Sequence, residues 1–153
     1  MYKRQALDNN TTCNKSLEYV QLGHQYLTDV AEIKIPNIEE RAQALSVMHA
    51  MLSSTSSVGI DPSDLGGTLR AGNSIVIFDT VPGGAGHVRR FIDKFEDISR
   101  DALQLVTNCE CGEDTSCYGC LRNFGNQTVH TELTRRSAIN VVSAFLGLSL
   151  IHI

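Results

Sequence analysis

The stretch SIVIFDTVPGGAGHVRRFIDKFEDISRDALQL, residues 74–105, decides the fold of this chain. Its first seven residues form a compact apolar run of strand length, which we expect to be buried on both faces. The glycine-rich segment 81–86 breaks this run, and apolar residues at helical spacing then predict one long helix over 88–105. The stretch therefore predicts a buried strand, a tight turn and a helix.

The segments on either side predict a small mixed domain. Residues 17–35 indicate two short strands, and Asn37 with Glu40 three residues later is typical of a capped helix, which ends by Gly59. Residues 61–67 are expected to form a loop, and residues 133–146 a last amphipathic helix.

The predicted class is α+β, a small sheet packed with three to four helices. We expect a flexible segment or linker stump over 1–15, one domain over 16–147, and a truncated or non-native tail over 148–153.

Length and charge restrict the possible functions. A chain of 153 residues with 42% hydrophobic content builds one core of ordinary size, and a net charge of -4 argues against a whole-chain grip on nucleic acid. Any contact with nucleic acid would have to be a local basic patch. The sequence shows neither a membrane-spanning run nor a secretory signal, so we expect a cytoplasmic protein with no membrane partner.

Four of the five cysteines lie close together as two short knuckles, Cys109-Glu110-Cys111 and Cys117-Tyr118-Gly119-Cys120. This spacing brings four thiolates together, and zinc accepts a tetrahedral shell of four sulfurs with no position left for a reacting water. The cluster therefore predicts one structural Zn²⁺ that joins the helix before it to the helix after it. A redox pair of Cys117 and Cys120, free buried thiols and an iron–sulfur cluster stay open as alternatives. The sequence assigns no role to Cys13.

Basic residues gather beside the glycine turn, just past the last cysteine and at the start of the final helix. We take Arg89, Arg90 and Arg122 as candidates for contact with nucleic-acid phosphates, because guanidinium groups bind phosphate oxygens without requiring a basic chain. A solvated surface is the simpler interpretation of the whole set, which also includes Lys94, Arg135 and Arg136.

The sequence predicts no catalytic residues. Asp79, the glycine turn and His87 resemble the layout that places an anion at a helix N-terminus, but the lysine of a phosphate-binding loop is missing. No ATPase motif or serine-hydrolase elbow appears, so we interpret this segment as a tight strand-to-helix turn, with an uncharacterised enzyme as the alternative.

Several stretches together resemble the C-terminal zinc-binding domain of MrfA-like, mitomycin-repair-type superfamily 2 helicases of the DEAD/DEAH class, formerly a domain of unknown function. The stretches cover most of the chain, and the strongest is the four-cysteine segment 109–124 with its continuation to His130. The others lie at 22–29, 59–61, 64–69 and 77–90.

The resemblance implies that Cys109, Cys111, Cys117 and Cys120 are zinc ligands and that the domain accompanies a helicase motor in DNA repair or phage defence. Because this chain carries no Walker motif, it would need a partner domain or subunit that hydrolyses ATP. We therefore expect a non-enzymatic accessory domain that positions DNA or docks the motor, with DNA as a second candidate partner. A stand-alone zinc-dependent protein-interaction module is the competing hypothesis.

Overall fold

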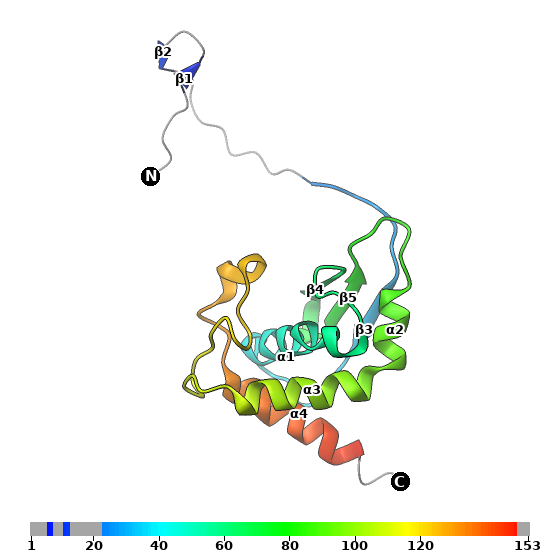
Figure 1. Cartoon of the computed structure of the whole chain (residues 1–153), viewed down its shortest axis with the longest axis vertical. Helices are drawn as coiled ribbons and strands as arrows, with labels where there is room; N and C mark the ends of the chain where they lie inside the picture. The colour runs from blue at the N-terminus through cyan, green and yellow to red at the C-terminus, as the bar shows by residue number, and fades with distance from the viewer. Residues whose placement is uncertain (1–5, 8–10, 13–22, 150–153) are drawn as a thin grey trace.

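The computed structural model describes residues 6–7, 11–12 and 23–149. Its helices are α1 (Arg41–Ser53), α2 (His87–Asp93), α3 (Phe95–Asn108) and α4 (Arg135–Ser149). Three strands form one sheet: β3 (Val30–Ile33), β4 (Leu65–Leu69) and β5 (Ile75–Asp79). Short 3-10 turns complete this part, η1 (Thr55–Val58), η2 (Ala71–Asn73) and η3 (Phe124–Val129), and β1 (Ala6–Leu7) pairs with β2 (Thr11–Thr12). Figure 1 shows α1 and α2 next to the sheet, with α3 and α4 packed below α1.

The sheet has the order β3-β5-β4, and both pairings are antiparallel. β5 is the central strand, and its side chains alternate between buried and half-buried. The odd-numbered residues Ile75, Ile77 and Asp79 face the helices, whereas Val76 and Phe78 face the other side. The expectation that this strand is buried on both faces was therefore wrong, because helices cover one face only. The predicted α+β class is confirmed.

The structure contains a strand where the sequence predicted a loop. β4 includes Gly66 and Gly67, and these glycines had suggested a break in the chain. A Cβ atom at Gly66 would lie 2.4 Å from the Phe78 ring, and one at Gly67 would lie 2.8 Å from the Met48 sulfur. The two glycines therefore allow the neighbouring strand and helix to pack closely against β4.

The long helix predicted over 88–105 is two helices. α2 ends at Asp93, and Lys94, with φ -110° and ψ 18°, separates it from α3. The break changes the direction of the apolar stripe. α2 packs on β3 and β5, and α3 packs on α1 and α4.

The first helix begins later than predicted. Asn37 has a left-handed backbone, with φ 63°, and does not cap the helix. Glu40 is the N-cap residue instead, and its backbone amide donates a hydrogen bond to Oε1 of Gln43 at 3.3 Å. The helix ends at Ser53, and η1 closes at Gly59, whose φ of 74° favours glycine.

The core lies between α1, α3, α4 and the inner face of the sheet. Its largest fully buried side chains include Met51, Ile60, Ile77, Phe91, Ile98 and Leu121.

No helix in the described part of the chain has the length and apolar character needed to cross a membrane. The first two-strand prediction, over 17–35, falls partly outside the described residues, as do the predicted terminal segments 1–15 and 148–153.

Candidate metal centre

The four clustered cysteines lie in the connection between α3 and α4. Cys109 is the residue at which α3 ends, and Cys111 follows in the first knuckle. Cys117 and Cys120 form a second tight turn, in which the Cys120 amide donates to the Cys117 carbonyl at 3.1 Å. The position of the cluster between the last two helices agrees with the sequence prediction.

The four Sγ atoms all lie within 4.8 Å of one another. Neighbouring sulfur pairs are 3.6 Å apart for Cys109–Cys111, 3.5 Å for Cys109–Cys117, 3.8 Å for Cys111–Cys120 and 3.9 Å for Cys117–Cys120. A tetrahedron with Zn–S bonds of about 2.3 Å has sulfur–sulfur edges of about 3.8 Å. Four of the six sulfur–sulfur edges therefore already lie close to those of a four-sulfur zinc shell.

Backbone amides also donate hydrogen bonds to sulfurs of the cluster. The Cys117 amide donates to Sγ of Cys120, and the Gly119 amide donates to Sγ of Cys117, both at 3.3 Å. Such donors favour the thiolate over the thiol, and the thiolate is the form that binds a metal.

Burial disfavours the charged thiolate form of these cysteines. It raises the pKa of the Cys120 thiol to about 12 and also raises the pKa of Cys111. By contrast, a backbone hydrogen bond from Cys111 lowers the pKa of Cys109 to about 7. Four thiolates at neutral pH therefore require a nearby cation, and a divalent metal supplies that charge.

Arg135 binds the metal-side end of α3 to the start of α4. Its side chain is 5% exposed, and its guanidinium donates to the carbonyl of Val106 at 2.6 Å, to that of Thr107 at 3.1 Å and to that of Cys111. The sequence had grouped Arg135 with the basic surface residues. The structure instead shows a buried guanidinium that satisfies three carbonyls at the edge of the cysteine cluster, a contact that no sequence pattern indicated.

Arg122 and Arg136 hold the loop that connects the two knuckles. Arg122 donates from Nε to Ser116 Oγ at 2.9 Å and from one terminal nitrogen to Thr115 Oγ1 and the His130 carbonyl. Arg136 pairs with Asp114 at 2.6 Å. Of the Arg122 donors, those on the other terminal nitrogen have no partner among the described residues.

The turn after the last cysteine depends on Asn126. Its buried side chain donates to the Leu121 carbonyl at 2.8 Å and accepts from the Asn123 amide at 2.8 Å. His130 Nε2 lies 2.8 Å from the same Asn126 oxygen. These contacts fix η3 against the second knuckle.

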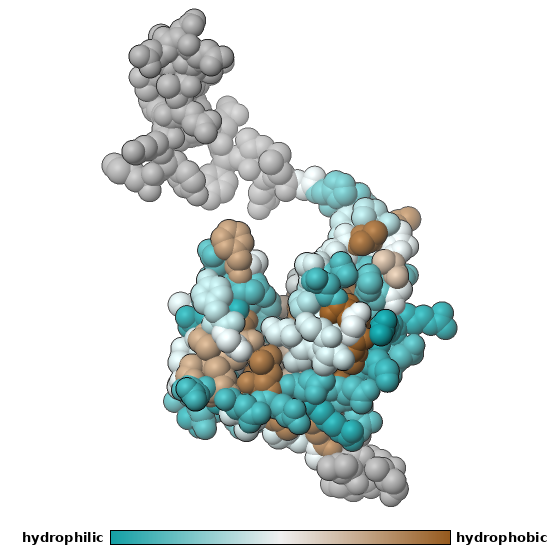
Figure 2. Space-filling view, viewed as in Figure 1, coloured by the Kyte–Doolittle hydropathy of each residue, from teal (hydrophilic) through white to brown (hydrophobic). Residues whose placement is uncertain are grey.

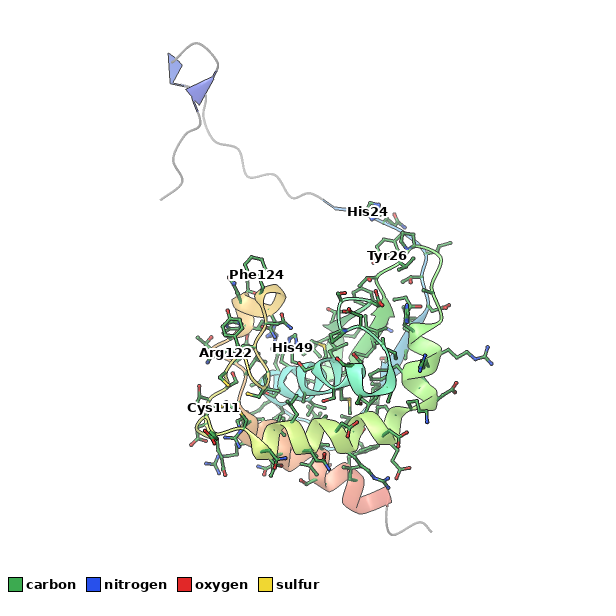
Figure 3. The ribbon with its side chains drawn as sticks, in the orientation of Figure 1. His24, Tyr26, His49, Cys111, Arg122 and Phe124 are labelled. Carbon is green, nitrogen blue, oxygen red and sulfur yellow. The ribbon has the colours of Figure 1, made fainter. Side chains whose placement is uncertain are left out.

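Arg89 and Arg90 lie far from this centre. Both are exposed on α2, whereas Arg122 lies on the cysteine loop at the other side of the molecule (Figures 1 and 3). Arg90 lines a groove of about 600 Å³ with Lys94, Arg100 and the Gly59 turn. Neither Arg89 nor Arg90 forms an ion pair within the described part of the chain, in contrast to Lys94 and Arg100.

The segment around Asp79 has the contacts of a structural turn. The Asp79 carboxylate is fully buried and accepts hydrogen bonds from the amides of Ala85 at 2.8 Å, Gly86 at 3.1 Å and Val88 at 3.1 Å. His87 lies 3.7 Å from Asp64 rather than beside Asp79. Both carboxylate oxygens of Asp79 are therefore occupied in holding the glycine turn and the start of α2.

Comparison with known proteins gives three findings. Residues 47–121 match the profile of the MrfA Zn-binding domain, and this segment includes all four clustered cysteines. The chain is 27% identical over 150 residues to the Druantia protein DruE of Escherichia coli (strain UMEA 4076-1), an alignment that covers 81% of this chain and 8% of DruE. It also superposes on the crystal structure of the DUF1998 helicase MrfA bound to DNA, with a TM-score of 0.54 and 19% identity.

The likeness to MrfA covers 84% of this chain and 16% of that helicase. At 19% sequence identity, this likeness shows a shared fold and nothing further. The chain thus spans only a small part of either relative. The profile match and the sulfur geometry agree on the metal, which is Zn²⁺. The chain therefore carries an MrfA-like zinc-binding domain, matched over residues 47–121.

Proposed function

We propose that this chain is a zinc-stabilised accessory domain that serves a DEAD/DEAH-type DNA helicase, without ATPase activity of its own. The observation that carries the proposal is the four-sulfur cluster inside the segment that matches the MrfA Zn-binding domain. Cys109, Cys111, Cys117 and Cys120 are the proposed ligands. Because four protein ligands complete the zinc shell, the metal would organise the fold and leave no position for a reacting water.

Within this proposal, Arg89 and Arg90 are the principal contacts for DNA phosphates. Both are exposed, lie on one short helix and have no ion-pair partner in the described residues. Arg122 stays a third candidate through its one uncommitted terminal nitrogen. The MrfA helicase was crystallised bound to DNA, which supports testing the same ligand here.

Titration of single- and double-stranded DNA at several salt concentrations tests the DNA contact. We expect weak binding that falls as salt rises, because phosphate contacts release counterions. In the variant Arg89→Ala/Arg90→Ala, the slope of log affinity against log salt should fall by about two, one for each lost phosphate contact. Fluorescence anisotropy of a labelled oligonucleotide measures both quantities.

The matched control is Arg41→Ala/Arg70→Ala, which removes the same charge from two exposed arginines that are already paired with Glu132 and Glu32. If both double variants weaken binding equally, the effect is one of net charge and the assignment to α2 fails. If the folded chain binds no DNA at low salt, the DNA role fails and docking of the motor remains.

A second candidate, a protein-docking role, is favoured by apolar side chains at the β3 side of the molecule. Leu27, Val30, Val81 and Ile92 are all exposed, and the amide of Gly83 donates to the Leu27 carbonyl at 2.8 Å, which holds the segment before β3 beside the glycine turn. A partner that covered these four side chains would remove their apolar surface from water. In a helicase assembly the motor would be that partner.

A further inference from the structure

A cleft separates the β4 edge of the sheet from η3, and α1 forms its floor. We call it the β4–η3 cleft; its two connected hollows, of about 600 and 290 Å³, share His49, Gly67, Gly125 and Asn126. Figure 2 shows the surface hollowed between the two lobes, and in Figure 3 Phe124 stands at the upper rim with His49 below it.

One wall of the cleft is an unpaired strand edge. β4 is the last strand in the order β3-β5-β4, so one side of its backbone has no neighbour in the described sheet. Thr80 donates to the Asp64 carbonyl at 3.0 Å, and Arg70 donates to the Ser74 carbonyl at 2.9 Å, which places the even-numbered residues of β4 toward β5. The amides and carbonyls that point outward belong to Leu65, Gly67 and Leu69, and the described residues give them no hydrogen bond.

The side chains around this edge leave the backbone accessible. Gly66 and Gly67 lack side chains because Phe78, Met48 and Leu52 occupy the space that a Cβ atom would need. Opposite them stands Phe124, which is 85% exposed and thus offers an apolar face to anything in the cleft. An exposed strand edge with bare backbone and an apolar wall is the arrangement that accepts an added strand.

The charge of the cleft disfavours nucleic acid. Among the residues that line it, the charged ones are Asp61 and Arg41, and Arg41 already pairs with Glu132 at 2.6 Å. A phosphate backbone requires free cations, which this lining does not supply. An extended polypeptide offers instead the neutral donors and acceptors, spaced two residues apart, that the edge of β4 lacks.

A polar group on the floor has no partner either. His49 Nδ1 is buried and forms no hydrogen bond with any residue that the structure describes, while its ring lines both hollows of the cleft. Burial lowers the pKa of His49 to about 4, so the ring is neutral at physiological pH and adds no positive charge to the floor. The floor is therefore suited to an uncharged segment.

From these observations we propose that the β4–η3 cleft binds an extended polypeptide segment by strand addition to β4, with an apolar side chain of that segment against Phe124. This site is distinct from the metal centre and from Arg89 and Arg90, so it does not depend on the DNA role.

Amide hydrogen exchange of the ¹⁵N-labelled 153-residue chain tests the proposal. The probe is a synthetic heptapeptide selected on this chain from a displayed random library. At saturation, exchange at Gly67 and Leu69 should slow at least about tenfold, because their outward amides gain acceptors. Exchange at Gly66 and Thr68 should not change, because their amides already face β5. Peptide binding that leaves Gly67 and Leu69 unprotected, or a library that yields no binder, would overturn the proposal.

Two apolar variants and one modified probe complete the test. Phe124→Ala should weaken peptide binding about tenfold, as expected for a central apolar anchor, whereas Ile92→Ala, which removes an apolar side chain that is 56% exposed and outside the cleft lining, should leave it within about twofold. N-methylation at alternate peptide residues, which removes the backbone N–H groups that would pair with β4, should abolish binding, and methylation at the intervening residues should not.

If oligo(dT) protects Gly67 and Leu69 in place of the peptide, the cleft binds nucleic acid and the proposal is wrong.

Discussion

Among single side chains, Asp79 organises the turn that connects the sheet to α2. Its buried carboxylate accepts three backbone amides, from Ala85, Gly86 and Val88. In Asp79→Asn an NH₂ group replaces one oxygen and faces amide donors, so we expect a loss of about 3 kcal/mol in the free energy of unfolding. Urea denaturation measures this loss. The exposed Asp93→Asn is the control and should change stability by less than about 0.5 kcal/mol; equal losses in both variants would contradict the structural role of Asp79.

His49 gives the stability of the domain a specific dependence on pH. Burial, with a smaller contribution from the charge of His130, lowers the His49 pKa from 6.5 to about 4. At pH values between 4 and 6.5, His49 is protonated in the unfolded chain but stays neutral in the folded chain. The contribution of neutral His49 is therefore complete above pH 6.5 and is lost as the pH falls toward 4, by up to about 1.4 kcal/mol per pH unit.

The measurement compares the unfolding free energy of the native chain and of His49→Gln at several pH values between 7.5 and 4.5. Protonation of the zinc-binding cysteines affects both proteins alike, so the difference between the two curves reports His49. The native chain should lose stability more steeply. Parallel curves would show that the histidine titrates normally in the folded chain.

At the scale of elements, Arg135 connects the end of α3, the cysteine cluster and the start of α4. Arg135→Met leaves three carbonyls without their donor, and we expect about 3 kcal/mol of lost stability together with weaker retention of zinc. Thermal melts and titration with a competing chelator measure the two effects. The exposed Arg136→Met, which breaks ion pairs with Glu113 and Asp114, should cost far less stability, because water screens exposed ion pairs. If the two variants behave alike, the buried contact is not what joins the helices.

The elements also show what the sequence could and could not predict. The apolar run of β5 and the spacing of the cysteines identified the central strand and the metal cluster without reference to other segments. β4 was missed because Gly66 and Gly67 resemble a turn locally, and only the approach of Phe78 and Met48 explains them. The break at Lys94 was missed because the apolar spacing continues across it, and the change of packing partner appears only in three dimensions. Arg135 gave no local signal for the same reason.

At the scale of the whole molecule, the metal should hold the cysteine loop together between α3 and α4. Elemental analysis should find one zinc per chain, and chelation should lower the melting temperature by more than about 10 °C, because metal binding and folding are coupled. Cys117→Ser should reproduce this effect, and Cys13→Ser, at the cysteine outside the cluster, should not. A chain without metal whose melt is unchanged by chelation would remove zinc as the structural centre.

The order of residues along the chain also sets an order of assembly. Arg135 lies 24 residues beyond Cys111, the residue of the cysteine loop whose carbonyl it binds. On the ribosome, all four thiols of the cluster emerge before this guanidinium does. The nascent chain can therefore capture its metal while the loop is still open, and α4 closes over the end of α3 afterwards. In zinc-depleted cells, α4 would then be synthesised before the cysteine loop had bound its metal.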